Sequence, residues 1–184
     1  MDALLKPLET LEAGIGAVEA SPKDIGKLEH IVRRLGVGLR EVLREGELDE
    51  KTGLTGDHWL ARGSSKNPDG SAHIDMQLTI MNSRVIDLVA GSRERWELAG
   101  DQLYVDFDLS VDHLPAGSRL AIGEAIVEIT PEPHTGCKKF MSRYGGDAVK
   151  FVNSPAGRRL RLRGLNARVI RGAAVRVGDI VKKL

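Results

Sequence analysis

Hydrophobic residues recur at two different spacings along the chain. Near its start they lie three or four positions apart, at Leu4, Leu8, Leu11, Ile15 and Val18. This spacing predicts one face of an amphipathic helix. Glycines at 14 and 16 interrupt it, and the Ser-Pro-Lys-Asp run at 21–24 ends it. We therefore expect a helical extension over residues 1–24, packed on a domain that spans residues 25–184.

Beyond residue 28 the hydrophobic spacing changes to two, which is typical of half-buried strands. Strands are predicted at 30–48 around two glycines, at 73–81, at 103–109, as a pair or one bulged strand at 119–130, at 158–163, and as a closing hairpin that turns near Gly172. Short helices are predicted at 83–90, where Asn82 or Ser83 supplies the N-cap, and in two segments after Cys137. Many short strands with few helices indicate a mainly β protein, a closed or nearly closed β-barrel.

Composition limits the class of protein. A chain of 184 residues suits one large domain, and its single cysteine excludes an internal disulfide or a multi-cysteine metal site. Aromatic residues make up 4% of the chain, which supplies few stacking platforms for single-stranded nucleic acid. The first residues are no secretory signal and no stretch has the length of a membrane span, so we expect a cytoplasmic protein with no membrane partner.

Charge is distributed unevenly although the formal net charge is +1. Residues 1–136 carry 14 Lys or Arg and 24 Asp or Glu, whereas residues 137–184 carry 13 Lys or Arg and 2 Asp. Two interpretations remain open. The basic segment faces an anionic ligand, or the two halves neutralise each other within one fold.

Cys137 lies in the segment TPEPHTGCKKF, directly before Lys138 and Lys139 at the predicted start of a helix. Amide dipoles and nearby cations stabilise a thiolate, so this position predicts a lowered thiol pKa and a reactive group. A thiolate attacks electrophilic sulfur and binds soft metals. The alternative is an inert buried cysteine that fills space.

Two other segments carry candidate chemistry. The loop TGLTGDHWLARG at 52–63 presents Asp57 and His58 beside Trp59, either as a site or as a polar loop held by the tryptophan. His73 and His134 are candidate partners of His58 that spacing alone does not connect to it. The run RRLRLRG predicts a strand with arginines on one wet face, which suits an anion such as phosphate, nucleic acid, or the acidic half of the chain.

Taken together, these segments resemble a MOSC domain, the module named for the C-terminal domain of molybdenum cofactor sulfurases. The resemblance covers about residues 25–184 and rests on the order of segments, from HIVRR through GLTGDHW and MQLTIMNSRVIDLV to LPAGSRLAIGEAIVEITPEPHTGCKKF. It implies a β-barrel in which the cysteine either carries sulfur as a persulfide or ligates the molybdenum of a pterin cofactor. Oxidoreductase members of this family reduce N-hydroxylated compounds.

The resemblance and the local chemistry together define a candidate site. Cys137 is the functional thiol and the metal ligand if molybdenum is bound, and His58 or His134 transfers a proton. Cationic and polar residues would bind the cofactor or stabilise a persulfide: Arg33, Arg34, Asp57, Asn82, Ser83, Lys138, Lys139, Arg143, Arg161 and Arg163. The chain departs from the family pattern in having Gly136, where a proline is common, and Gly100-Asp101-Gln102 in place of a Gly-Glu-Asn run.

Three functions follow as hypotheses. The first is sulfur carriage, in which a cysteine desulfurase donates sulfur and keeps the pyridoxal phosphate on its own chain. The second is a molybdenum-cofactor-dependent reductase served by a separate electron-transfer protein. The third is a non-catalytic barrel that binds an anion or RNA through Arg159, Arg161, Arg163 and Arg168, although the composition makes nucleic acid a poor candidate.

Overall fold

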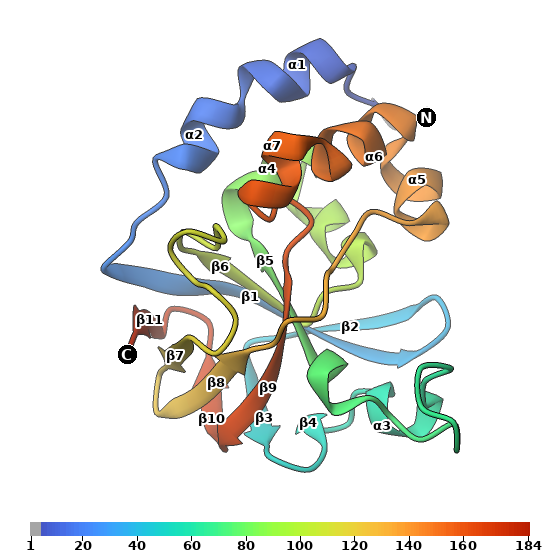
Figure 1. Ribbon diagram of the computed structural model, residues 1–184, viewed down its shortest axis with the longest axis vertical. Coiled ribbons are helices and arrows are strands. Elements are labelled where there is room, and N and C mark those ends of the chain that lie inside the picture. Colours follow the sequence, from blue (N-terminus) through green and yellow to red (C-terminus); the bar gives the residue numbers. More distant parts are fainter. Residues whose placement is uncertain (1–4) are drawn as a thin grey trace.

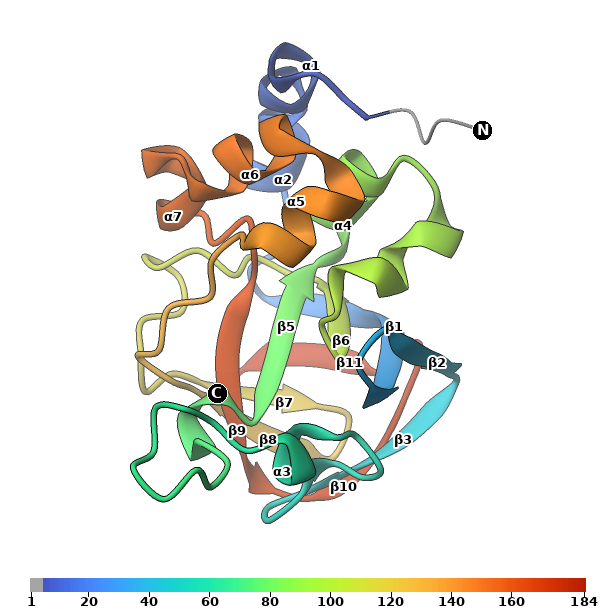
Figure 2. The same cartoon turned by 90° about the vertical axis from the view of Figure 1, so that its right-hand side faces the viewer.

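The computed structural model describes residues 5–184, which fold mainly as β-sheet (Figures 1 and 2). Seven strands form the barrel: β1 (Ile25–Gly36), β5 (Leu78–Asn82), β6 (Leu103–Asp106), β7 (Arg119–Ile122), β8 (Ala125–Ile129), β9 (Leu165–Arg171) and β11 (Ile180–Lys183). Around the ring they run in the order β1-β11-β7-β8-β9-β5-β6 and close again on β1. All neighbours are antiparallel except β5 and β6. The predicted mainly β barrel is confirmed.

Strand β1 closes the barrel because it is long enough to pair with three strands in turn. Its first residues pair with β11, its middle with β6, and its last residues with β2 (Leu39–Leu43). Gly38 provides the turn between β1 and β2 with a φ of 78°, a conformation that favours glycine. The hairpin of β1 and β2 therefore extends beyond the ring (Figure 1).

A small second sheet contains β3 (Glu45–Asp49), β4 (Gly53–Leu54) and β10 (Ala173–Arg176). The hairpin predicted near Gly172 is wrong, because β9 pairs with β8 and β5 whereas β10 pairs with β3. Gly172 passes so near to β3 that a Cβ atom there would lie 2.5 Å from the Leu48 carbonyl oxygen. The chain bends at this residue from one sheet into the other.

The helices are short. The α-helices are α1 (Leu8–Ala13), α2 (Ile15–Glu19), α3 (Trp59–Arg62), α4 (Ser83–Ala90), α5 (Lys138–Tyr144), α6 (Gly146–Asn153) and α7 (Pro155–Arg159), and the 3-10 helices are η1 (Ile74–Met76) and η2 (Arg93–Ala99). All the α-helices except α3 gather over one end of the barrel, and α3 lies at the other end (Figures 1 and 2). Among residues 5–184, no helix is long and apolar enough to cross a membrane.

Two hydrophobic clusters stabilise this arrangement. One fills the barrel interior with residues such as Leu28, Ile80 and Phe107, and the other packs the helices against the outside of the strands through residues such as Trp96 and Phe151. Strand β5 is buried on both faces because it separates the two clusters. The structure accordingly begins this strand at Leu78, and the first part of the predicted 73–81 strand is the 3-10 turn η1.

The predicted helix near the start is present and is divided at Gly14 into α1 and α2, with Leu11 and Val18 buried. Leu4 belongs to the same predicted face but lies outside the described residues. The predicted cap of α4 is confirmed, because the Asn82 side chain accepts a hydrogen bond from the Arg84 backbone N–H at 2.8 Å.

The RRLRLRG strand prediction is wrong. Arg159 ends helix α7, and the residues after it form turns in which Arg161 has a φ of 49°. The helix begins where Ser154 accepts a hydrogen bond from the Gly157 N–H at 2.9 Å, followed by Pro155 at its first position. This start places the alternating arginines on different surfaces, and they share no wet face.

Candidate functional site

Cys137 lies at the end of the irregular segment that leads from β8 to α5. It is exposed and occupies the N-cap position of α5, with extended backbone angles of φ −120° and ψ 178°. Helix α5 is fixed beneath it by the buried rings of Phe140 and Tyr144. The alternative interpretation, an inert cysteine that fills space in a core, is therefore wrong.

The thiol opens into a cavity of about 310 Å³. Its walls come from the β1–β2 hairpin, from the end of the loop that enters α3, from the turn before β6 and from α5. The predicted site residues that line it are Arg34, His58, His134, Cys137, Lys139, Arg143 and Arg163. A volume of this size suits a small-molecule ligand.

Two buried ion pairs form the floor of the cavity. Arg34 donates from Nε to Asp57 Oδ2 at 2.9 Å and from Nη2 to Asp57 Oδ1 at 2.8 Å. Arg163 donates to Asp101 Oδ2 at 2.6 Å and to the Ala99 carbonyl oxygen at 2.9 Å. Burial alone would raise the pKa of Asp101, but Arg163 and His134 lower it to about 2. The Arg34 hydrogen bonds likewise outweigh burial and lower the pKa of Asp57.

Further cations line the cavity without a carboxylate partner. Arg40 donates to the Leu39 carbonyl oxygen at 2.9 Å, and Arg143 donates to the Leu98 carbonyl oxygen. Within residues 5–184, Arg62 and Lys139 make no side-chain hydrogen bond or ion pair. Six cationic side chains thus line a cavity whose ion pairs supply two carboxylates, which leaves a surplus of positive charge.

Three buried polar atoms of residues in the cavity wall have no hydrogen-bond partner among the described residues. They are Nε of Arg40, Nε of Arg163 and Nδ1 of His58. Burial, with the nearby Arg143 and Arg34 charges, lowers the pKa of Arg40. Unpaired buried donors are costly, so a ligand that accepts hydrogen bonds here would relieve this cost.

The two candidate histidines both line the cavity, although 76 positions of sequence separate them. His134 Nε2 lies 2.8 Å from Asp101 Oδ1. Burial and the Arg163 charge lower the pKa of His134, and burial and Arg34 lower that of His58. Both imidazoles are therefore neutral at pH 7 and can accept a proton. His73 lies elsewhere, with its Nε2 4.0 Å from Glu132.

Six predicted binding residues do not line the cavity. Arg33 forms an ion pair with Glu41 at 2.6 Å. Lys138 is exposed and lies between two residues that do line the cavity, Cys137 and Lys139. Asn82 and Ser83 begin α4, where Asn82 also donates to the Phe107 carbonyl oxygen at 3.0 Å. Arg161 donates instead to the carbonyl oxygens of Leu109 and Leu114. Asp57 contributes indirectly, through its ion pair with Arg34.

Sequence reasoning missed Arg40, Arg62 and Asp101. Arg40 reaches the cavity because the β1–β2 register places it opposite Arg34. Arg62 follows His58 by one helical turn, a spacing that was visible in the sequence. Asp101 was noted in the sequence only as a departure from the Gly-Glu-Asn run of the MOSC pattern that the chain resembles.

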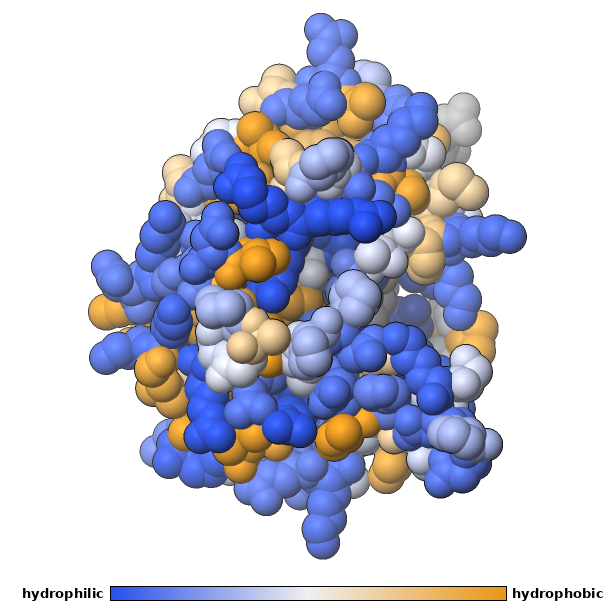
Figure 3. Space-filling view, in the orientation of Figure 1, coloured by the Kyte–Doolittle hydropathy of each residue, from blue (hydrophilic) through white to orange (hydrophobic). Residues whose placement is uncertain are grey.

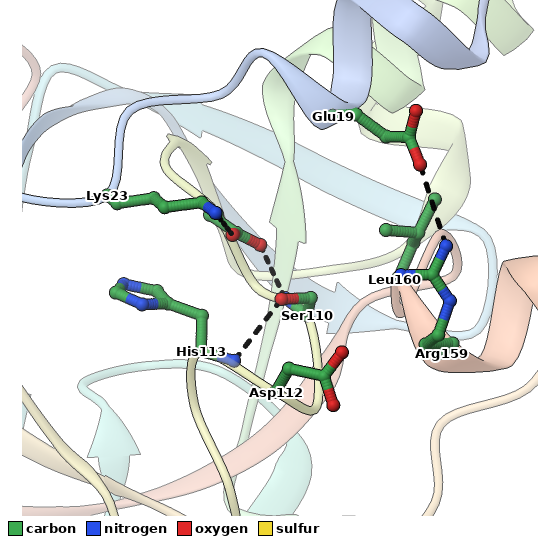
Figure 4. A pocket seen from close by; sticks show the side chains of 8 residues that line it. Glu19, Lys23, Ser110, Asp112, His113, Arg159 and Leu160 are labelled. Atoms are coloured by element: carbon green, nitrogen blue, oxygen red, sulfur yellow. Dashed lines mark hydrogen bonds and ion pairs between the residues drawn. The ribbon is translucent and has the colours of Figure 1, made fainter.

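A second hollow of about 300 Å³ lies between the N-terminal helices and the barrel (Figure 4). Ion pairs cross it from Glu19 to Arg159 at 3.5 Å and from Lys23 to Asp108 at 3.9 Å. The face that contains it is largely hydrophilic, with scattered hydrophobic residues (Figure 3). Because its charges are largely paired, this hollow is a seam between the N-terminal extension and the domain.

The arginines of the nucleic-acid hypothesis are engaged within the protein. Arg159 pairs with Glu19, Arg163 with Asp101, and Arg168 with Glu128 at 2.7 Å. The structure therefore provides no shared face for them. Among residues 5–184, no group of three or more His, Cys, Asp or Glu side chains is placed to hold a metal ion.

Solved structures share this fold. The YuaD protein from Bacillus subtilis is 18% identical over 86% of this chain and 95% of that chain, with a TM-score of 0.62. YiiM from Escherichia coli is 16% identical over 86% of this chain and 69% of that one, with a TM-score of 0.54. YiiM from Geobacillus stearothermophilus is 12% identical over 86% and 75%, with a TM-score of 0.56.

No family model matches the chain, and no curated protein matches it. At identities below 20% the structural likeness establishes the fold alone. That fold fits the MOSC-like barrel that the sequence resemblance implies.

Proposed function

We propose that the protein binds a molybdenum-pterin cofactor in the cavity beside Cys137. The observation that carries this proposal is the surplus of cations in the wall that contains the thiol. A phosphate-bearing ligand would neutralise these cations, and guanidinium groups bind phosphate through paired hydrogen bonds. The unpartnered donors of Arg40 and His58 fit such an anionic group. A thiolate fits a soft metal.

Different residues of the cavity wall would bind the anionic group, ligate the metal and transfer a proton. Arg40, Arg62 and Arg143 would hold the anionic part of the ligand, while Cys137 would ligate the metal as the single protein thiolate. When bound, the cofactor supplies oxidation–reduction chemistry of the kind that family members apply to N-hydroxylated compounds. The neutral imidazoles of His58 and His134 would accept or return a proton at the reacting group. Electrons would come from a separate protein.

The test is to purify the protein from cells that make the cofactor and to measure molybdenum and pterin fluorescence per chain. We expect near-stoichiometric metal in the wild type and little in Cys137→Ser. Arg40→Gln with Arg62→Gln should weaken binding about a hundred- to ten-thousandfold, because the pair of variants removes two charge-assisted hydrogen bonds that cost about 1.5–3 kcal/mol each. Arg44→Gln is the matched control, since Arg44 is exposed and lies outside the cavity. Wild-type protein that stays free of molybdenum and pterin would contradict the proposal.

A second candidate function is sulfur carriage, which the exposure of Cys137 favours because a donor's active site could reach it. The Cys137 thiolate would attack the outer sulfur of a persulfide on a cysteine desulfurase. The donor's S–S bond would break, its cysteine would leave as a thiolate, and Cys137 would retain the outer sulfur. Lys139 and Arg143 would stabilise the new persulfide anion.

Intact mass after incubation with a desulfurase and cysteine tests this candidate. It predicts a gain of one sulfur atom that a reductant reverses and that Cys137→Ser abolishes. A free, accessible thiol that gains no sulfur would remove sulfur carriage and leave the cofactor proposal standing.

A further inference from the structure

The segment that carries Cys137 has no regular secondary structure between β8 and α5, yet side chains from other elements hold it. Asn166, a fully buried residue of β9, donates to the carbonyl oxygens of Glu132 at 3.1 Å and Pro133 at 3.4 Å. Asp101 holds His134. These contacts fix the first part of the segment, up to His134. They do not hold Thr135 and Gly136, the two residues before the thiol.

Asn153 holds the last part. Its Oδ1 accepts a hydrogen bond from the Gly136 backbone N–H at 2.9 Å, and its Nδ2 donates to the Gly136 carbonyl oxygen at 3.0 Å. One side-chain amide at the end of α6 thereby satisfies both backbone groups of the residue that precedes Cys137. Two hydrogen bonds in opposite directions restrain that peptide more strictly than a single one would.

This arrangement requires the glycine. A Cβ atom at position 136 would lie 2.8 Å from Val152 Cγ2 and 3.3 Å from Asn153 Nδ2, so a side chain would press into the contact. A proline has no N–H to donate to Asn153. The sequence departs from the family pattern here because an asparagine restrains the backbone where a proline ring often does.

We propose that Asn153 is a positioning residue that holds the Cys137 thiol within the cationic wall of the cavity. The proposal deepens the function proposed above and rests on it, since position matters only if the thiol acts together with these cations. Helix α5 does not fix the thiol by itself, because Cys137 lies at its N-cap and its side chain caps no N–H group. Without Asn153, the Gly136 backbone has no described partner and Gly136 is free to rotate.

The experiment compares two disulfide reagents that react with thiolates in the same way. The Cys137 thiolate attacks one sulfur, the S–S bond breaks, and a coloured thiolate leaves. Dithiobis(nitrobenzoate) is anionic and dithiodipyridine is neutral. At low salt, cations around the thiol should raise the ratio of anionic to neutral rate about tenfold or more above that of N-acetylcysteine amide. In Asn153→Ala the ratio should fall several-fold toward that of the free thiol.

The rate ratio reports where the thiol lies, because a change in intrinsic thiol reactivity would alter both rates together. Asn67→Ala is the matched control, since among the described residues the side chain of this asparagine bonds only within its own loop, to Ser71 and Ala72, and not to the Gly136 backbone. Asn153→Gln keeps a neutral amide one methylene further out and should give an intermediate ratio. A folded Asn153→Ala protein with the wild-type ratio would overturn the proposal.

A wild-type ratio equal to that of the free thiol would instead refute the cationic site on which the proposed function depends. If Asn153→Ala does not fold, the proposal is tested by the rate ratio of Asn153→Gln and by hydrogen exchange of the Gly136 amide in the wild type. Slow exchange of the Gly136 N–H is expected, and exchange as fast as in an open loop would overturn the proposal.

Discussion

Two hollows on the molecule have nearly equal volumes, about 310 Å³ beside Cys137 and about 300 Å³ under the N-terminal helices. Both are lined with charged groups. Under the helices, Glu19 faces Arg159 and Lys23 faces Asp108, so opposite charges meet across the seam. Beside Cys137, the carboxylates of Asp57 and Asp101 neutralise Arg34 and Arg163, and the other cations of the cavity wall have no carboxylate partner within residues 5–184.

This difference in charge pairing distinguishes charged groups that stabilise the fold from charged groups that can bind a ligand. Paired charges across a seam orient two elements and need nothing further. Unpaired arginines held near one another repel, so they reduce stability and are retained where an anion will neutralise them. Volume does not distinguish the two hollows, whereas the balance of charge does.

The largest predicted effect comes from breaking a buried pair beneath the cationic cavity. Asp101→Asn leaves the Arg163 guanidinium buried without a counter-ion and should lower the free energy of unfolding by about 3–5 kcal/mol. Urea unfolding measures it. Asp108→Asn in the other hollow is the comparison and should cost about 1 kcal/mol or less, because its partner Lys23 is exposed. Equal losses would erase the distinction between the two regions.

Acid should weaken the fold next. Burial lowers the pKa of His30 to about 4, and the pKa values of His58 and His134 are also lowered. A histidine with a depressed pKa stabilises the fold above its ordinary value of about 6.5, and this contribution is lost as pH falls toward the folded value. Unfolding free energy should therefore drop by about 2–3 kcal/mol between pH 7 and pH 4. His30→Gln should reduce that slope, and an unchanged slope would contradict the assignment.

Removing one of the unpaired cations of the cavity wall should raise the free energy of unfolding, whereas the changes above lower it. Arg40→Gln relieves repulsion from Arg34 and Arg143, so it should raise the free energy of unfolding by about 0.5–1 kcal/mol while weakening binding of the anionic ligand. Thermal unfolding in low salt, with and without cofactor, measures both effects. Destabilisation of the ligand-free protein would show that Arg40 serves the fold.

The smallest effect is predicted for the seam. Glu19→Gln removes one partner of an exposed pair and should change stability by about 0.2–1 kcal/mol, with no change in molybdenum content. The same urea and metal measurements apply. A loss of bound molybdenum in this variant would connect the two hollows and overturn their separation.

Sequence patterns predicted the parts of this structure that depend on near neighbours. The Asn82 cap, the 119–129 strand pair and the helices after Cys137 rest on local signals, and all are present. The alternation of arginine and leucine at 158–163 misled, because Ser154 and Pro155 start a helix just before it. The Ser154-Pro155 helix start is also a local signal, but the alternation of arginine and leucine that follows it has the two-residue spacing of a strand and favoured the wrong prediction.

The site was predictable only in part. Cys137, His58, His134 and Arg34 carry recognisable chemistry and do line one cavity. Arg40 reaches it through strand register, and Asp101 acts from beneath it through an ion pair with Arg163, neither of which spacing in the sequence reveals. Asn153 bears no chemical signature of its own, and its importance depends on a contact across 17 positions.

The pairing of β1 with β11 also has a consequence for the order in which the chain can fold. Ile25 lies opposite Lys182, so the ring closes between residues 157 positions apart in the sequence. During synthesis β1 must therefore lack one neighbour until β11 has left the ribosome. Contacts so distant in sequence are formed slowly. Ring closure is therefore expected to be a late event in folding, and a nascent chain that lacks β11 would present an open sheet edge to other chains.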